Sequence, residues 1–246
     1  MFARPKEAAT VIVLRHRSEQ PVDGFEVLMV LRSKESKFVP SSYVFPGGAL
    51  DEEDCSPEME ALCRGVEPSG AFVALKGIPT PAMALGTWVA GIRETFEEVG
   101  LLLAYQADRR LLSFDHVKAT RYERYRSLLN QAKLTFGDML QKEALTLATD
   151  RLHYFSHWIT PWFLPIRYDV RFFVVEAPAG QEAHHDGVEL TDHIWITPQE
   201  ALRRYRGNRF EMVYPTLMTI QALLPYRTID EVIHATAGKN IPAESG

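Results

Sequence analysis

Apolar and polar positions follow a helical period in the stretch 91–101 of this chain. At about 100° per residue, one side of such a helix carries only bulky apolar side chains, as a core-facing side does. These side chains are Trp88, Ile92, Phe96, Val99 and Leu103. The opposite side carries Glu94, Glu97 and Glu98, whose i, i+3 and i+4 spacing places three carboxylates on one patch. Gly100 follows, as glycine often does just past a helix end, so the pattern predicts a short helix with an apolar side and an acidic side.

Runs of apolar and β-branched residues elsewhere predict the strands of a sheet. A short apolar piece at 43–45 ends at Pro46, and a turn signal lies at 21–24. The longer predicted strands are 8–14, 25–31, 153–159, 168–176 and 193–196. The turn signal separates the first two of them, which are therefore expected to form a hairpin.

Helix signals alternate irregularly with these strands. Ser56 and Pro57 have the chemistry of an N-cap and a first helical residue, so a helix is expected from there to about residue 64. The Gly- and Pro-rich segment 65–81 is predicted to be irregular loop, and helix resumes near Ala82. The remaining predicted helices are a helical hairpin at about 115–149, a helix that begins at Thr197-Pro198, and helices at 214–224 and 229–236. Because strands and helices do not alternate strictly, we expect an α/β fold with a mixed central sheet and helices on both faces.

Length and composition fit a single domain spanning residues 1–246. Of these residues 46% are hydrophobic and 24% are charged, as in ordinary globular proteins. The net charge of −5 argues against a nucleic-acid binder, which needs a basic surface. A small phosphorylated ligand held by a few arginines remains compatible with it.

The cysteine count and the lack of long apolar runs bear on location. Cys55 and Cys63 are too few for a disulfide scaffold and have no metal-ligand spacing, so a reducing compartment is expected. The first ten residues lack the apolar centre of a signal peptide, and no run of about 18 apolar residues predicts a membrane span. We therefore expect a cytoplasmic protein that acts away from membranes.

The acidic patch has two interpretations. Charge runs are usually solvated surface, and this is the ordinary interpretation of three glutamates on one helix side. A hard divalent cation such as Mg²⁺ or Mn²⁺ would instead turn their mutual repulsion into attraction, because such ions prefer oxygen ligands. The upstream turn Phe45-Pro46-Gly47-Gly48 favours the second interpretation, since it completes a recognisable pattern.

Together, this turn and the run from Arg93 to Gly100, Arg-Glu-x-x-Glu-Glu-x-Gly, resemble the split halves of the Nudix box, the motif of the Nudix hydrolases. The likeness covers about residues 8–206 and includes the segments 31–33 and 157–161. Asp54 stands where the motif has its first glutamate, and 38 residues (55–92) follow where the motif has seven, so 31 are surplus. A long insertion here, at about 55–86, resembles the coenzyme A diphosphatase subgroup. The resemblance implies an α/β/α sandwich with a mixed central sheet, an insertion and extra helices.

The resemblance also implies roles for motif residues. Glu94, Glu97 and Glu98 correspond to metal ligands and candidate catalytic residues, with Mg²⁺ or Mn²⁺ as the cofactor. Gly47 would lend a backbone carbonyl to the metal, and Arg93 would hold the glutamates in place.

Three further positions complete the candidate site. Gly48 opens the motif and is assigned to substrate binding. Arg32 could contact a substrate phosphate, with a surface ion pair as an equal alternative. Many family members add a downstream loop glutamate as a base or further ligand; Glu189 matches this best, and Glu182 is the second choice.

The implied activity is metal-dependent hydrolysis of a diphosphate linkage in a nucleoside diphosphate derivative. Coenzyme A or an acyl-CoA is the first choice of substrate, and ADP-ribose, nucleotide sugars and dinucleotides remain open. A nucleotide-sensing module without catalysis is the alternative of another class, which the retention of all three glutamates disfavours. A homodimer is compatible with the family, although no interface is marked in the sequence.

Other clusters have weaker functional interpretations. Trp158, Trp162 and Phe163 could stack on a base, but core packing is the preferred interpretation. The adjacent histidines His184 and His185, with the aspartate that follows them, could bind a metal, but solvent exposure is preferred.

Overall fold

The computed structural model describes residues 4–17, 24–36, 39–185, 187, 189–237 and 241–245. Its main sheet has the strand order β10-β2-β1-β9-β8-β11, with β3 paired to β2 and β4 paired to β1. The strands are β1 Lys6–His16, β2 Phe25–Arg32, β3 Tyr43–Val44, β4 Gly47–Ala49, β8 His153–Ile159, β9 Tyr168–Glu176, β10 Leu190–Ile196 and β11 Ala243–Ser245. Parallel pairs (β1 with β9, β8 with β11) and antiparallel pairs occur together, so the sheet is mixed, as predicted.

The five longer predicted strands are all present. The expected hairpin is confirmed by antiparallel pairing of β1 with β2, in which Leu14 faces Val27. Residues 21–23 of the predicted turn lie outside the described part of the chain. Strand β11 was not predicted.

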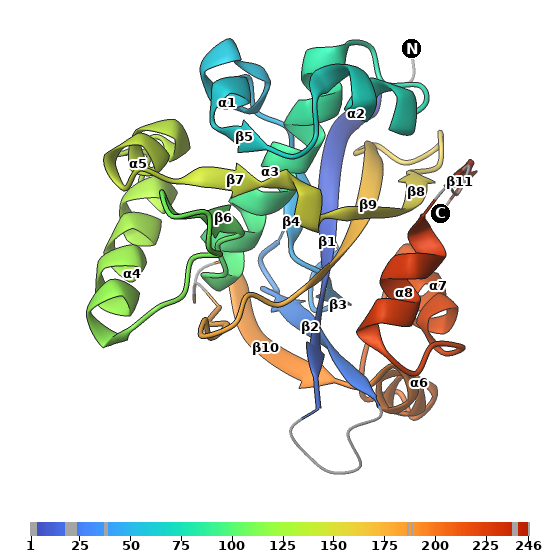
Figure 1. Cartoon of the computed structure of the whole chain (residues 1–246). Helices are drawn as coiled ribbons and strands as arrows, with labels where there is room; N and C mark the ends of the chain where they lie inside the picture. The colour runs from blue at the N-terminus through green and yellow to red at the C-terminus, as the bar shows by residue number, and fades with distance from the viewer. Residues whose placement is uncertain are drawn as a thin grey trace.

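Helices cover both faces of the sheet (Figure 1), which confirms the expected α/β arrangement. Helix α3 (Pro81–Val99) lies against one face, and α6 (Pro198–Arg206), α7 (Tyr214–Leu223) and α8 (Ile229–Thr236) cover the other. The predicted N-cap at Thr197 is present, since its side chain accepts a hydrogen bond from the Glu200 N–H at 3.2 Å.

Two hydrophobic cores result from the alternation of side chains along the strands. On β1, Val11 and Val13 belong to the core shared with α3, whereas Ile12 and Leu14 belong to the core shared with α6–α8. Four residues of the predicted apolar side of the glutamate helix are buried in the first core, as the helical period requires: Trp88, Ile92, Phe96 and Val99. Leu103 is buried in the same core, but it lies past the end of α3 and not on the helix.

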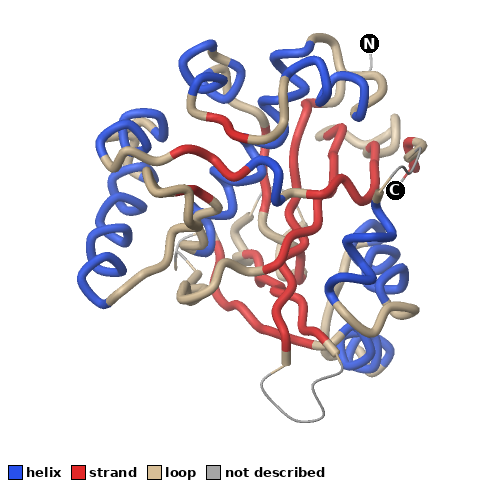
Figure 2. The backbone as a smooth tube through the Cα atoms, in the orientation of Figure 1, coloured by secondary structure: helices blue, strands red, loops and turns tan. Residues whose placement is uncertain are grey.

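The segment between the motif halves is more ordered than predicted (Figure 2). Helix α1 (Pro57–Ala61) starts on the predicted N-cap Ser56, but it ends before residue 64, because β5 (Cys63–Arg64) pairs with β7 (Thr146–Ala148). Strand β6 (Ala104–Tyr105) completes this second sheet. The prediction of irregular loop at 65–81 is wrong: α2 (Pro68–Ala74) forms there, since Pro68 suits a first helical position and the helix buries Ala71.

The region 115–149 contains α4 (His116–Asn130) and α5 (Phe136–Lys142). Its last residues leave the helical path, because β7 joins the second sheet and residues 149–151 form a 3₁₀ turn. Within the described residues, no helix has both the length and the apolar character needed to cross a membrane.

Candidate active site

The three predicted glutamates lie in the last two turns of α3. The helix ends at Gly100, whose φ of 75° is the left-handed conformation that glycine adopts without strain. This is the negative end of the helix dipole, where carboxylates are electrostatically unfavourable unless positive groups compensate them. Glu98 is 6% exposed and the other two are half-buried, so the patch is not the solvated helix face of the ordinary interpretation.

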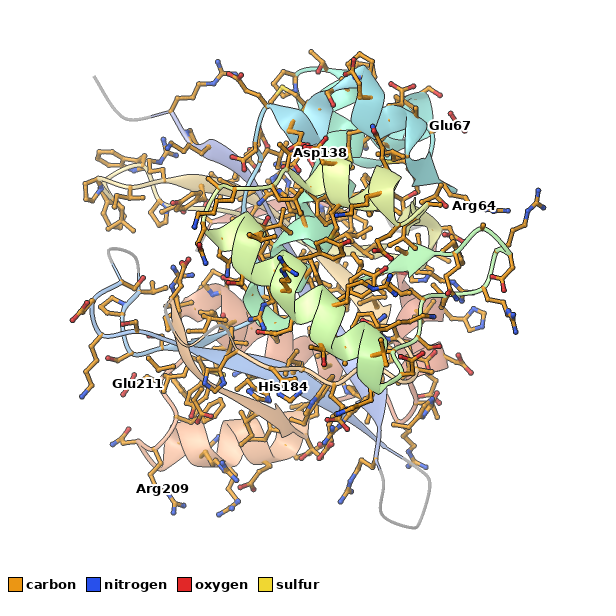
Figure 3. All side chains as sticks on the ribbon, turned by 90° about the vertical axis from the view of Figure 1, so that its left-hand side faces the viewer. Arg64, Glu67, Asp138, His184, Arg209 and Glu211 are labelled. Atoms are coloured by element: carbon orange, nitrogen blue, oxygen red, sulfur yellow. The ribbon has the colours of Figure 1, made fainter. Side chains whose placement is uncertain are left out.

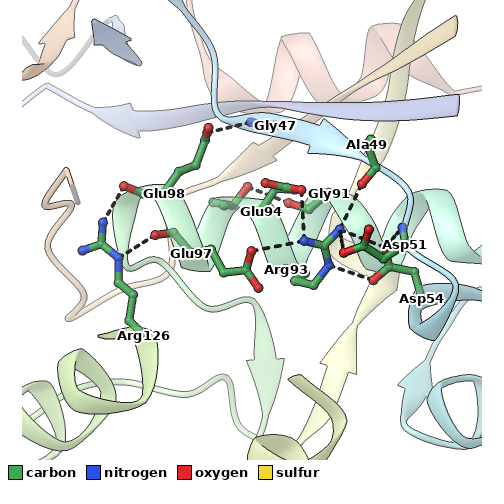
Figure 4. A network of polar contacts seen from close by, with 11 residues as sticks. Gly47, Ala49, Asp51, Asp54, Gly91, Arg93, Glu94, Glu97, Glu98 and Arg126 are labelled. Atoms are coloured by element: carbon green, nitrogen blue, oxygen red, sulfur yellow. Dashed lines mark hydrogen bonds and ion pairs between the residues drawn. The ribbon is translucent and has the colours of Figure 1, made fainter. Parts of the chain in front are cut away.

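Arg93 compensates part of this charge from inside the protein (Figure 4). Its Nη1 donates to Glu94 Oε1 at 3.0 Å and to Glu97 Oε2 at 3.1 Å, and its Nη2 donates to the Ala49 carbonyl at 3.0 Å. The other edge of the guanidinium forms a two-bond contact with Asp54, at 2.9 and 3.0 Å. Burial alone would lower the pKa of Arg93, but the hydrogen bonds and charge of Asp54, with the glutamates, raise it.

Asp54 therefore has a partner that the sequence did not reveal. The aspartate that departs from the family pattern is 2% exposed, and it also accepts the Asp51 N–H at 2.9 Å. It bridges the loop that follows β4 to the arginine of α3, across a long sequence separation. Its role is to fix the orientation of Arg93.

A second arginine holds the end of α3 from another element. Arg126 of α4 is 2% exposed; its Nε donates to the Glu97 carbonyl at 2.8 Å and its Nη2 to the Glu98 carbonyl at 2.5 Å. These carbonyls are among the last four of the helix, which have no partner within it. Nothing in the local sequence of α4 singles out Arg126, because the contact depends on how α4 packs against α3.

The upstream turn meets the glutamates, as the split-motif interpretation requires. The Gly47 N–H donates to Glu98 Oε2 at 2.9 Å. A Cβ at Gly48 would collide with the carboxylate of Glu94, so glycine is needed for this close approach. The surplus residues of the insertion therefore do not keep the two fragments apart.

The carboxylates of α3 hold their protons unusually tightly. Burial raises the pKa of Glu94 to about 7, and the charge of Glu97 adds to the effect while Arg93 opposes it. Burial, followed by the charge of Glu94, raises the pKa of Glu98 well above its ordinary value. Burial also raises the pKa of Glu97. Such a set of crowded carboxylates is stabilised in its charged form by an additional positive group.

A cavity of about 590 Å³ extends from these glutamates, a size typical of small-molecule sites. Glu94, Glu98, Arg32 and Glu189 line one end of it. Arg32 and Glu189 form an ion pair there, and Arg32 Nε also donates to Ser36 Oγ at 3.1 Å. The Arg32 side chain is 15% exposed and the Glu189 side chain is 53% exposed, so the ion pair joins a largely buried arginine to an exposed glutamate at the cavity wall.

Several other residues that the sequence suggested for the site lie away from the glutamates. Glu182, the second choice for the loop glutamate, has a 90% exposed side chain, 3.9 Å from His184 Nε2, and does not line the cavity. His184 lies at the surface on the side of the molecule that carries α4 (Figure 3). His185 Nδ1 is 2.9 Å from His193 Nδ1, and the aspartate of the predicted histidine cluster lies outside the described residues.

The cysteines and the aromatic residues considered from the sequence differ in burial. Burial raises the pKa of Cys55 to about 11 and that of Cys63 to about 12, so neither thiol is an activated nucleophile. Trp158 is buried, as expected for core packing. The same expectation is wrong for Trp162 and Phe163, which are 61% and 66% exposed because they lie in the loop after β8.

The donor set fits a divalent cation by its chemistry. Across the described ranges, no group of three or more His, Cys, Asp or Glu side chains is arranged as a metal cage. Glu94 and Glu97 contact Arg93 instead, and Glu98 contacts the Gly47 N–H. These acidic oxygens at a helix carboxyl end, with raised pKa values, are nevertheless the ligands that hard cations prefer.

Comparison with known proteins bears on this geometry. The family model of the NUDT19 Nudix domain matches residues 5–223. The acyl-coenzyme A diphosphatase NUDT19 of Xenopus laevis is 25% identical over 270 residues, covering 92% of this chain and 71% of that protein. The same-named protein of Gallus gallus is 24% identical over 92% of this chain and 70% of its own length. A crystal structure of a Nudix hydrolase from Alicyclobacillus acidocaldarius matches with a TM-score of 0.73 at 25% identity, covering 94% and 96% of the two chains.

Fold, site and family match together define a hydrolase with a mixed sheet between helices and an acidic helix at its cavity. The chain belongs to the Nudix hydrolase family, and within it the chain is similar to the NUDT19 group. The predictions of the family, of an enzyme and of the subgroup resemblance are confirmed. Nudix hydrolases generally use divalent metal ions, and the homologues act on small nucleotide-type substrates.

Proposed function

We propose that this protein is a metal-dependent diphosphatase that hydrolyses coenzyme A or an acyl-CoA. The products would be 4′-phosphopantetheine, or its acyl form, and adenosine 3′,5′-bisphosphate. The observation that carries the proposal is the position of Glu94 and Glu98 against the Gly47-Gly48 turn, at one end of a large cavity. The names of the Xenopus and Gallus relatives support the choice of substrate class.

Glu94, Glu97 and Glu98 would hold Mg²⁺ or Mn²⁺, with the Gly47 carbonyl as a further ligand. A bound divalent ion supplies positive charge to the diphosphate oxygens and lowers the pKa of water. Arg93 and Arg126 do not contact the substrate in this proposal. They fix the acidic helix end by direct hydrogen bonds, so that its carboxylates are preorganised.

We assign proton transfer to Glu189 and phosphate binding to Arg32. A water molecule attacks one phosphorus and gives a proton to the Glu189 carboxylate; the bond from that phosphorus to the bridging oxygen breaks, and the second phosphate leaves with this oxygen. The ion pair with Arg32 orients the Glu189 carboxylate. The same guanidinium, at the cavity wall, can donate to a phosphate oxygen. Gly48, which also lines the cavity, would bind the substrate through its backbone.

The test is a product analysis with the purified full chain. The protein is incubated with Mg²⁺ or Mn²⁺ and with coenzyme A, octanoyl-CoA, ADP-ribose, NADH and nucleoside triphosphates, and the products are identified by mass. We expect 4′-phosphopantetheine species and adenosine 3′,5′-bisphosphate, and none without a divalent ion. Turnover confined to ADP-ribose or NADH would overturn the substrate class, and turnover of no compound would overturn the proposal.

A further inference from the structure

The loop between β8 and β9 exposes a dense group of apolar side chains. Trp162, Phe163, Leu164 and Ile166 are all at least 39% exposed within five residues of chain. The rings of Trp162 and Phe163 meet edge to face, with centroids 5.9 Å apart. A concentrated apolar group of this kind on a protein surface commonly marks a binding site.

This loop is part of the cavity that holds the glutamates. Phe163 and Leu164 line the cavity at the end away from α3, together with Trp158 of β8 and Tyr214 at the start of α7. Trp158 and Tyr214 pack edge to face, with ring centroids 5.9 Å apart, which joins β8 to α7 at this wall. We call these four residues, with Trp162, which packs on Phe163 but does not itself line the cavity, the apolar wall.

The sheet sets the distance between the two ends. Gly48 of β4 pairs with Ala9 of β1, Ala8 pairs with Val170 of β9, and Val170 pairs with Trp158 of β8. Three strand spacings of about 4.8 Å therefore separate the Gly47-Gly48 turn from β8, or about 14 Å. The pantetheine arm of coenzyme A has the length of about four extended residues, roughly 13 Å. An arm whose phosphate lies at the glutamates is thus long enough to reach Trp158, the part of the apolar wall that lies on β8.

The distribution of charge in the cavity indicates which end of the substrate lies at the apolar wall. Among the described residues that line the cavity, Arg32 is the only cation, and it lies at the glutamate end in its ion pair with Glu189. The nucleotide end of coenzyme A carries a 3′-phosphate, which is costly to desolvate without a cationic partner. The pantetheine arm is uncharged, and an acyl group on its sulfur is apolar. The wall therefore suits the arm and its acyl group and not the nucleotide.

Resting on the proposed function, we propose that the apolar wall binds the acyl end of an acyl-pantetheine arm. The wall makes the enzyme prefer acylated coenzyme A over free coenzyme A. Full burial of a methylene corresponds to about a fourfold gain in binding, so partial burial of an octanoyl chain gives at least a tenfold preference in kcat/KM.

A binding measurement tests the wall without hydrolysis. S-Octanoyl-pantetheine, which has no phosphate, is titrated into the full chain in the absence of divalent ions while tryptophan emission is recorded. We expect a saturable blue shift that Trp162→Phe removes, and no shift with adenosine 3′,5′-bisphosphate. A shift caused by the nucleotide and not by the acyl arm, or by neither ligand, would overturn the proposal.

A kinetic comparison tests the preference. We expect Phe163→Ser combined with Leu164→Ser to lower kcat/KM for coenzyme A and octanoyl-CoA, and to lower the ratio of octanoyl-CoA to coenzyme A at least fivefold. The control is Phe72→Ser on α2, an exposed aromatic residue away from the cavity, which should change neither value.

The outcomes separate this inference from the proposed function. If the wild type releases 4′-phosphopantetheine but the double variant keeps the wild-type ratio of kcat/KM for octanoyl-CoA to kcat/KM for coenzyme A, the wall assignment is wrong and the proposed function stands. If the wild type cleaves no coenzyme A compound, the proposed function is wrong. A third outcome concerns lipid. If the wild type sediments with phosphatidylcholine vesicles and the double variant does not, the loop binds a lipid surface and the proposal is overturned.

Discussion

The two ends of the cavity are built on opposite principles. At the glutamate end, charged side chains are buried or half-buried, and Arg93 and the Gly47 turn hold them by hydrogen bonds from different elements. At the apolar wall, Trp162 and Phe163 are mostly exposed and lie in a loop. Catalysis requires charges fixed within a fraction of an ångström, whereas binding of a flexible apolar chain tolerates side-chain movement.

The two ends also differ in how much each one costs the stability of the fold. Burying Glu98 and Arg93 is unfavourable unless both are compensated, so the glutamate end depends on Asp54, Arg126 and the Gly47 turn. The apolar wall depends on few contacts and can vary with little effect on stability. Substitution of the residues that hold Arg93 should therefore lower stability, whereas substitution of exposed residues of the apolar wall should not.

The largest effect is expected from Glu98→Gln, with Glu97→Gln as its companion. Each amide keeps the shape of the side chain but removes a metal-binding charge, so kcat should fall at least about a thousandfold. Because burial already raises the pKa of both carboxyls, the thermal unfolding midpoint should not decrease. Steady-state rates at saturating Mg²⁺ and thermal scans measure both quantities; near-wild-type turnover in both variants would remove the metal-site assignment.

The next largest effect is expected from Asp54→Asn. It leaves the buried guanidinium of Arg93 without its two-bond anionic partner, and removing one member of a buried pair costs about 3 kcal/mol of unfolding free energy. Chemical denaturation followed by circular dichroism measures this loss. The control is Glu200→Gln, which breaks exposed ion pairs to Arg203 and Arg204 and should leave the midpoint unchanged. Equal midpoints for the two variants would contradict the account of Arg93.

Arg126→Lys should weaken metal binding without unfolding the protein. A lysine cannot donate to the Glu97 and Glu98 carbonyls together in the geometry of the guanidinium. Loss of a residue that orients metal ligands typically costs about 10–100-fold in metal affinity. Calorimetric titration with Mn²⁺ measures it, with Arg121→Lys on the exposed side of the same helix as the control. If both variants bind Mn²⁺ equally tightly, Arg126 has no positioning role.

Metal affinity should fall as the pH decreases through about 7. Burial raises the pKa of Glu94 to about 7, so below that pH a proton must leave before an ion binds, and affinity falls about tenfold per pH unit for one proton. In the absence of metal, the stability of the folded protein changes with pH in the opposite direction. The raised pKa costs stability while Glu94 is charged, and this cost is fully present above pH 7 and disappears as the pH falls toward the ordinary value of 4.5. Mn²⁺ titrations at pH 6, 7 and 8 measure the affinity; a flat profile would contradict the raised pKa.

The smallest effect is expected at the apolar wall. Phe163→Ser should leave the unfolding midpoint within error of the wild type, because its side chain is largely exposed in the folded protein. Phe173→Ala in the core beneath α3 is the contrasting variant, with an expected loss of about 3–5 kcal/mol. A large destabilisation by Phe163→Ser would show that the loop supports the fold and would weaken the contrast between the two ends.

Local patterns in the sequence were sufficient for most elements. The alternation along β1, the apolar side of α3 and the caps at Ser56 and Thr197 depend on neighbours within a few residues, and all were predictable. Helix α2 was missed because Gly and Pro dominate its surroundings, although Pro68 also suits a helix start. Strands β5 and β7 were missed because such short strands are defined by their partner and not by their own period.

The sequence by itself determined which residues form the candidate site: three glutamates on one helix side, an arginine beside them and a glycine turn upstream. Only the tertiary structure decided that Gly47 meets Glu98 across the insertion, that Asp54 and Arg126 fix the arginine and the helix end, and that an apolar loop after β8 closes the same cavity. The physical reason is the distance along the sequence over which each kind of interaction acts. Helical and strand periods act over a few residues, whereas these contacts depend on how whole elements pack.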